Sequence, residues 1–144
     1  MIYTNMTKRA MQITFDAHKN QSDKTGLPYI YHPFYLAEQM TDEISVCVAL
    51  LHDVVEDTTA TFDDLTAQGI TTAVIEILKL LTNDNTVPYM EYVKNIKDSG
   101  NQTAIAVKLA DLRHNSDVSR LDDVDGKMLE RLEKYKVAIC ILEH

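Results

Sequence analysis

The sequence predicts an all-α fold, and three observations lead to this class. Apolar residues recur at three- and four-residue intervals, whereas the alternation of half-buried strands is missing. Only four glycines and three prolines occur in 144 residues, which is few for a loop-rich β protein. A chain of this length that is 45% hydrophobic suits one core, so we assign residues 1–144 to a single helical-bundle domain.

The first two helices are expected on either side of a polar loop. Thr7 to His18 carries apolar residues at helical spacing, and Gly26 to Pro28 has the composition of a turn. Proline is tolerated best in the first turn of a helix, so Pro33 predicts that a second helix begins there. His32 would then be its N-cap, just outside the helix.

The remaining helices each have a start or stop signal. A third helix, capped by Thr41 or Asp42, is expected to run on to the acidic residues Glu56 and Asp57. The other expected helices cover 62–68 after Thr61, 71–81, 89 to near Gly100, 104–114 and 129–142.

One stretch combines an apolar run with an unusual density of polar groups. Ala49 to Thr58 reads ALLHDVVEDT, and on a continuous helix His52 and Glu56 would share a face, with Asp53 and Asp57 as a second pair. Burying these groups among valines and leucines would be costly without a partner, and a metal ion would be one. A polar stripe facing water is the alternative, and this stretch alone does not decide between them.

Two other segments offer metal-ligand types where an apolar run ends. His32 starts one helix, and Asp111 interrupts the apolar face of another, which it shares with His114 and Asn115. Alone, an Asp in such a setting is most often a capping or salt-bridged residue. Together with His52 and Asp53, these residues form a set of two histidines and two carboxylates, which suits Mn, Fe, Zn or Co with coordination left open for water.

Bulk properties exclude several classes of partner. A net charge of −8 argues against binding to DNA or RNA backbones. No apolar run approaches the ~20 residues that span a bilayer, and the N-terminus has no signal-peptide pattern. We therefore expect no membrane partner and a cytoplasmic location, with Cys47 and Cys140 as reduced thiols in the core.

Three blocks of this sequence resemble one known family. GLPYIYHP at Gly26 to Pro33, ALLHDVVEDT at Ala49 to Thr58 and VKLADLRHN at Val107 to Asn115 are similar to the hydrolase domain of the RelA/SpoT family, within the HD metallophosphohydrolase superfamily. That family includes stand-alone small alarmone hydrolases of about this length. The resemblance, which spans roughly Ala10 to Leu121, implies an HD-type bundle with a central metal site.

The resemblance also implies a reaction and the residues for it. These hydrolases remove the 3′-pyrophosphate of (p)ppGpp, giving GDP or GTP and pyrophosphate, usually with Mn²⁺. A small nucleotide is therefore the expected partner, a homo-oligomer is left open, and no synthetase domain is expected because the chain ends soon after the third block. Carried over by position, the metal ligands are His32, His52, Asp53 and Asp111, the water-handling pair is Glu56 and Asp57, and Lys24 and Asn115 contact the substrate.

This chain departs from the family pattern at positions that face the substrate. Ser22-Asp23-Lys24 stands where relatives have consecutive basic residues, and the loop Thr82 to Asn85 lacks a lysine that relatives often carry. Leu112-Arg113 is reversed relative to the family order. Two alternatives follow: the same site acting on another nucleotide, or a non-catalytic module that binds nucleotides.

Overall fold

The computed structural model describes residues 1–144 and contains helices but no β-strand beyond an isolated bridge between Ser22 and Pro28. The all-α prediction is therefore confirmed. The helices are α1 (Asn5–His18), α2 (Tyr31–Glu38), α3 (Glu43–Leu51), α4 (Val54–Asp57), α5 (Phe62–Ala67), α6 (Thr72–Leu81), α7 (Tyr89–Asp98), α8 (Gln102–Asn115), the 3-10 helix η1 (Val118–Arg120) and α9 (Gly126–Glu143).

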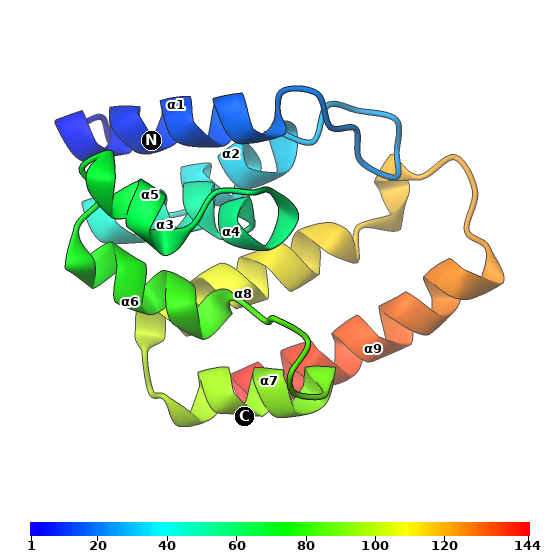
Figure 1. Ribbon diagram of the computed structural model, residues 1–144. Helices are drawn as coiled ribbons and strands as arrows, with labels where there is room; N and C mark the ends of the chain where they lie inside the picture. The colour runs from blue at the N-terminus through cyan, green and yellow to red at the C-terminus, as the bar shows by residue number, and fades with distance from the viewer.

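Helix α3 is the centre of the packing. Every residue from Ser45 to Leu51 is buried, as expected for a helix that is apolar all round. Helices α1, α2, α6 and α8 contact it, while α7 and α9 pack together on the far side of α8 (Figure 1). The resulting core contains 27 buried hydrophobic residues. No helix is both long enough and apolar enough to cross a membrane.

The predicted caps explain where several helices begin and end. The Asp42 side chain accepts a hydrogen bond from the Ser45 backbone N–H, so Asp42 rather than Thr41 caps α3. Thr61 and Asp64 form a reciprocal capping box at the start of α5. Gly69 ends that helix with a φ of +95°, a conformation that favours glycine.

The continuous third helix was a wrong prediction. Helix α3 ends at Leu51, His52 and Asp53 form a turn, and α4 starts at Val54. His52 and Glu56 therefore do not lie on one uninterrupted helix. The cause is local: the His52 imidazole bonds the Ala49 carbonyl, and such side-chain bonds compete with continuation of the helical ladder.

Two further expectations also need correction. His32 lies inside the first turn of α2, whose N-cap is Ile30, because the helix already begins at Tyr31. Cys140 is exposed on α9, whereas Cys47 is buried as expected. The 3-10 helix that precedes Leu121 was not anticipated from the sequence.

Candidate metal centre

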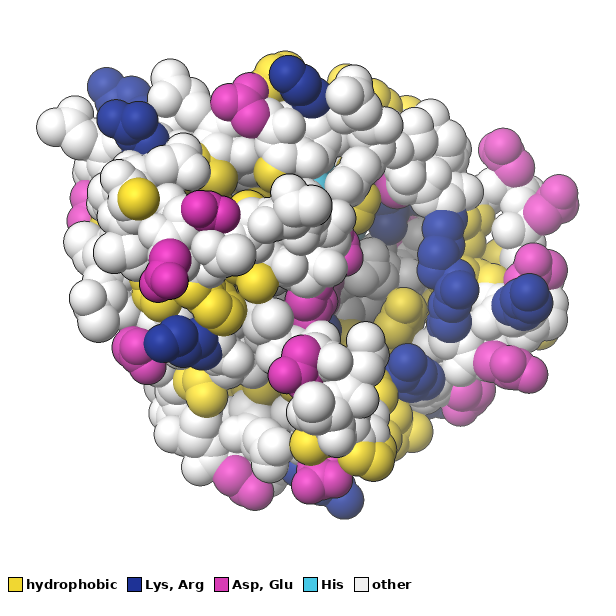
Figure 2. All heavy atoms as spheres, in the orientation of Figure 1, with side chains coloured by type: hydrophobic (Ala, Val, Ile, Leu, Met, Phe, Trp, Pro, Cys, Tyr) yellow, Lys and Arg dark blue, Asp and Glu magenta, His cyan; other side chains and the backbone are white.

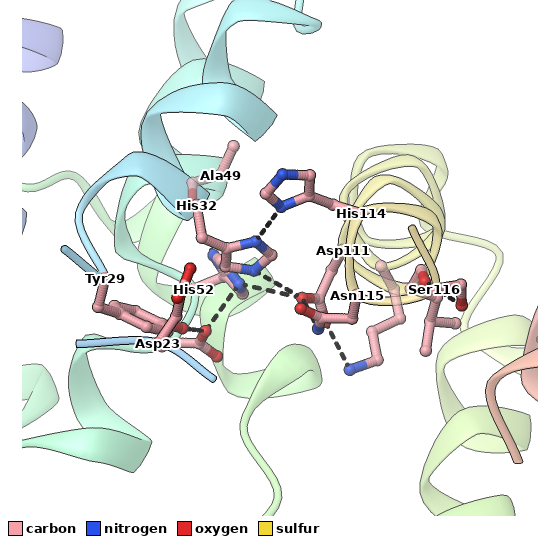
Figure 3. Close-up of polar contacts among 12 residues, drawn as sticks. Asp23, Tyr29, His32, Ala49, His52, Asp111, His114, Asn115 and Ser116 are labelled. Atoms are coloured by element: carbon pink, nitrogen blue, oxygen red, sulfur yellow. Dashed lines mark hydrogen bonds and ion pairs between the residues drawn. The ribbon is translucent and has the colours of Figure 1, made fainter. Parts of the chain in front are cut away.

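Four side chains from separate parts of the chain converge at one point. One ligand atom from each of His32, His52, Asp53 and Asp111 lies within 4.8 Å of the others. His32 comes from α2, His52 and Asp53 come from the turn that follows α3, and Asp111 comes from α8. Figure 3 shows His32, His52 and Asp111 directed toward one another. Asp53 is half-buried and the other three residues are buried, so the group lies below the protein surface and reaches it only at Asp53.

His52 is oriented by the backbone behind it. Its Nδ1 lies 2.7 Å from the Ala49 carbonyl oxygen, to which it must donate, and this leaves Nε2 facing the carboxylates. Nε2 is 3.0 Å from Asp53 Oδ2 and 3.6 Å from Asp111 Oδ1, yet it is buried and hydrogen-bonds to neither. Burial by itself would lower the pKa of His52, but the Asp53 and Asp111 charges outweigh it and raise the pKa well above its usual value.

His32 is held by a second histidine. Its Nε2 is 2.9 Å from Asp111 Oδ1, and its Nδ1 is 2.7 Å from Nδ1 of His114. The His114 ring is stacked on His32 and on Tyr35. Burial, then the neighbouring His32 and Arg120, lower the pKa of His114 to about 4, so His114 is neutral at pH 7 and can accept a hydrogen bond from His32.

The two carboxylates have partners that keep them ionised. Lys108 Nζ lies 3.0 Å from Asp111 Oδ2, and the Asn115 amide donates to Oδ1 at 3.0 Å. Burial opposes ionisation of Asp111, but Lys108 and both histidines hold its pKa well below the usual value. The Tyr29 hydroxyl donates to Asp53. Burial likewise opposes ionisation of Asp53, but the neighbouring His52 outweighs this effect and lowers the pKa of Asp53.

These residues fit a divalent metal ion. An imidazole nitrogen that is buried, without a hydrogen bond and close to two carboxylate oxygens requires a cation between them, either a proton or a metal. Two imidazoles and two carboxylates are donors that Mn, Fe, Zn and Co accept. The supporting bonds to Ala49, His114 and Asn115 are of the kind that orient metal ligands.

Glu56 and Asp57 follow the cluster on α4. The Glu56 carboxylate accepts a hydrogen bond from the Asn83 backbone N–H, which ties α4 to the loop between α6 and α7. Partial burial raises the pKa of both residues, and the nearby Asp53 charge adds to the effect. A carboxylate with a raised pKa beside a candidate metal site is suited to exchange a proton with water.

A pocket opens beside the cluster and holds both predicted substrate residues. Its volume is about 300 Å³, and its lining includes two residues of α9, Met128 and Tyr135. The surface is hollowed beside α9, and Lys and Arg side chains lie at the edge of this hollow (Figure 2). Lys24 is exposed at this pocket, and Asn115 lines it while bonding Asp111. The lining residues are Ser22, Asp23, Lys24, Thr25, Tyr29, His32, Asn115, Asp117, Arg120, Leu121, Met128 and Tyr135.

Some supporting residues could not be found by sequence reasoning. Tyr29 and His114 both lie inside blocks that resemble the family, but nothing in their spacing assigns them a contact. His114 is 82 positions from His32, its hydrogen-bond partner. Lys108 lies three positions before Asp111, and its pairing with that carboxylate also became evident only from the structure.

The fold has a counterpart among solved structures. A metazoan ortholog of SpoT, described as hydrolysing ppGpp, superposes with a TM-score of 0.79 at 25% sequence identity, covering 99% of this chain and 85% of that one. No family model matches the chain.

Sequence relatives include both short and long proteins. A zebrafish protein named guanosine-3′,5′-bis(diphosphate) 3′-pyrophosphohydrolase MESH1 is 34% identical over 134 residues, covering 83% of this chain and 72% of that protein. The bifunctional (p)ppGpp synthase/hydrolase SpoT of Escherichia coli is 33% identical over 120 residues, which is 75% of this chain but 17% of SpoT. The chain thus spans about a sixth of the longer bacterial relatives.

The helical bundle and its His/Asp cluster define an HD-type hydrolase fold with a site for a divalent metal. Within that class, the chain belongs to the RelA/SpoT-type (p)ppGpp hydrolase family. The resemblance carried by the three sequence blocks is confirmed.

Proposed function

We propose that this protein is a metal-dependent phosphohydrolase that removes the 3′-pyrophosphate of (p)ppGpp, giving GDP or GTP and pyrophosphate. One observation carries the proposal: four ligand atoms converge within 4.8 Å beside a pocket of nucleotide-binding size. The names of the relatives that match most of this chain support the choice of reaction.

His32, His52, Asp53 and Asp111 would hold the metal, for which we propose Mn²⁺. When bound, the ion lowers the pKa of water and offsets charge on the phosphoryl oxygens. The protein's own contribution is orientation: the bonds to Ala49 and His114 fix both imidazole rings before a metal arrives.

Glu56 is proposed as the general base, with Asp57 beside it to orient the attacking water. Glu56 takes a proton from that water, whose oxygen forms a bond to the phosphorus linked to the ribose. The bond between that phosphorus and the ribose 3′ oxygen breaks, and the 3′ oxygen takes up a proton. Lys24 would attract the phosphates and Asn115 would hold the ribose.

The proposed partner is a small nucleotide and not DNA or RNA, in keeping with the net charge of −8. We place this activity in the cytoplasm. Leu121, Met128 and Tyr135 form an apolar part of the pocket wall against which a nucleobase could pack.

The test is pyrophosphate release from ppGpp by the Mn²⁺-loaded protein. Asp53→Asn should lose bound metal and activity together. Glu56→Ala should keep the metal but lose about 10²–10⁴-fold in kcat, the usual contribution of a general base. Glu76→Ala, which removes an exposed glutamate of α6, is the matched control and should behave like the unaltered protein. Full activity in Glu56→Ala would refute the assigned role.

The same assay separates the alternatives. Apart from His32, the pocket lining offers only Lys24 and Arg120 as basic side chains, so a nucleotide with fewer phosphates deserves inclusion as a substrate. Turnover of such a nucleotide without turnover of ppGpp would replace the proposed substrate. Binding of ppGpp in Mn²⁺ without turnover of any nucleotide would support a non-catalytic module.

A further inference from the structure

Arg120 is a cation of the pocket wall that does not belong to the metal cluster. It lies in η1, after the end of α8, and lines the pocket together with Lys24, Tyr29 and His32. The Arg120 side chain is 23% exposed, whereas Lys24 is an exposed loop residue whose side chain makes no hydrogen bond or ion pair. Arg120 is therefore the better-ordered of the two positive charges.

The hydrogen bonding of Arg120 is incomplete. A guanidinium carries five N–H donors, and here Nη2 donates to the His114 carbonyl oxygen at 2.9 Å. Nε is buried and has no partner. Nη1 lies 3.6 Å from Asp23 Oδ2, which is too long for a hydrogen bond although the charges still attract.

Asp23 is already committed to its own loop. Its Oδ1 accepts hydrogen bonds from the Thr25 backbone N–H, the Thr25 hydroxyl and the Leu27 backbone N–H. These bonds fix the turn between Ser22 and Pro28 and hold Asp23 back from a close pair with Arg120. Asp23 thus balances part of the charge of Arg120 without occupying its donors.

The backbone around Arg120 is also fixed. Asp117 caps η1 by accepting a hydrogen bond from the Ser119 backbone N–H, and the bond from Nη2 to the His114 carbonyl anchors the side chain to the end of α8. A guanidinium held in place with free donors matches the geometry of a phosphate, which it can bind through two parallel hydrogen bonds. In a protein of net charge −8, such a local positive charge is needed to hold an anion.

We propose that Arg120 is a specificity-determining residue that binds a second phosphate group of the substrate, away from the metal cluster, by exchanging its loose contact with Asp23 for a phosphate. This inference rests on the proposed function for the identity of that group: the reacting 3′-pyrophosphate lies at the metal ligands, so Arg120 takes the 5′-phosphates. Arg120 thereby supplies positive charge to a pocket that lacks the consecutive basic residues of the family pattern before Gly26.

Binding of GDP and of guanosine to metal-free protein tests the proposal without catalysis. Isothermal titration should show that Arg120→Gln lowers the affinity for GDP at least about tenfold, because charged hydrogen bonds to the phosphates are lost. The affinity for guanosine, which has no phosphate, should be unchanged. Arg120→Lys keeps the positive charge but not the two parallel N–H donors of the guanidinium, and it should give an intermediate loss of GDP affinity. Arg113→Gln, at an exposed arginine paired with Glu143, is the matched control and should leave GDP affinity unchanged.

The outcomes are separable from those of the proposed function. Equal GDP affinity in Arg120→Gln and Arg113→Gln would overturn the role of Arg120. So would a loss of guanosine affinity in Arg120→Gln that equals its loss of GDP affinity. If the protein does not hydrolyse ppGpp, the proposed function fails, but an Arg120-dependent affinity for GDP still supports this site. If ppGpp is hydrolysed, Arg120→Gln should raise KM for ppGpp with little change in kcat. The KM for guanosine 3′-diphosphate, which has no 5′-phosphates, should not change.

Discussion

The contact between two imidazoles shows how a single residue supports the metal site. His32 can present Nε2 to a metal only if its Nδ1 carries the proton, and His114 is the group that accepts this proton's hydrogen bond. The low pKa of His114, about 4, keeps it neutral and able to accept. His114 therefore selects the tautomer of His32.

Replacing His114 should weaken metal binding without removing a ligand. His114→Ala should lower Mn²⁺ affinity about 10–100-fold, the usual cost of losing an outer partner of a ligating histidine. Isothermal titration with Mn²⁺ measures this directly. His114→Gln retains an acceptor and should recover part of the affinity, and His144→Ala, at the exposed C-terminal residue, should have no effect. Unchanged affinity in His114→Ala would remove the orienting role.

Metal affinity should also depend on pH, through His52. The Asp53 and Asp111 charges raise its pKa well above 6.5 despite burial, so at pH 7 a metal must displace a proton from Nε2. Apparent affinity should therefore rise about tenfold per pH unit above pH 6.5 and level off above the raised pKa. Asp53 and Asp111 add no slope there because their pKa values are lowered. Titrations in buffers of different ionisation enthalpy would count the released proton; no release and a flat profile would contradict the assignment.

At this scale, the sequence pointed to the four clustered residues better than to the residues that support them. His32, His52, Asp53 and Asp111 stand out because each polar group ends an apolar run. One hydrogen bond links each supporting residue to the cluster: Tyr29 to Asp53, His114 to His32 and Ala49 to His52. The sequence does not reveal whether such a bond forms. Only the packing of α2 against α3 and α8 decides it.

Among the elements, α3 was predicted correctly in type but not in extent. The apolar run that makes it a central helix also suggests that it continues to Glu56, since valines at 54 and 55 fit the same periodicity. The turn at His52 and Asp53 depends on a bond from the imidazole to the Ala49 carbonyl, which periodicity does not report. The interruption lies at His52 and Asp53, two adjacent residues whose ligand atoms both belong to the cluster.

Because α3 is surrounded by other helices, shortening one of its side chains should be costly. Leu50 is fully buried, and Leu50→Ala should lower the free energy of unfolding by about 2–5 kcal/mol. Urea unfolding followed by circular dichroism measures the change. Leu129→Ala on α9, where the side chain is 56% exposed, should cost less than about 0.5 kcal/mol. Similar losses in the two variants would contradict the central position of α3.

For the whole molecule, metal binding should be visible as stability. The ligands join α2, α8 and the turn after α3, so an ion that binds only the folded chain stabilises all of them together. Mn²⁺ at about 100 times its Kd should add about 2.7 kcal/mol, which for a chain of this size raises Tm by about 5–10 °C. Differential scanning calorimetry with Mn²⁺ and then EDTA tests this. Asp53→Asn should abolish the shift, and a shift that survives in that variant would indicate binding elsewhere.

The pocket has one wall of core helices and another of connecting segments, and this division bears on how the protein can evolve. The four candidate metal ligands lie on α2, on α8 and in the turn after α3, next to the core, where most substitutions are destabilising. Lys24 and Arg120 lie in a loop and a short 3-10 helix, which tolerate change far better. For the hydrolase that we propose, mutations at the rim can therefore exchange one phosphorylated substrate for another while the clustered histidines and aspartates stay the same.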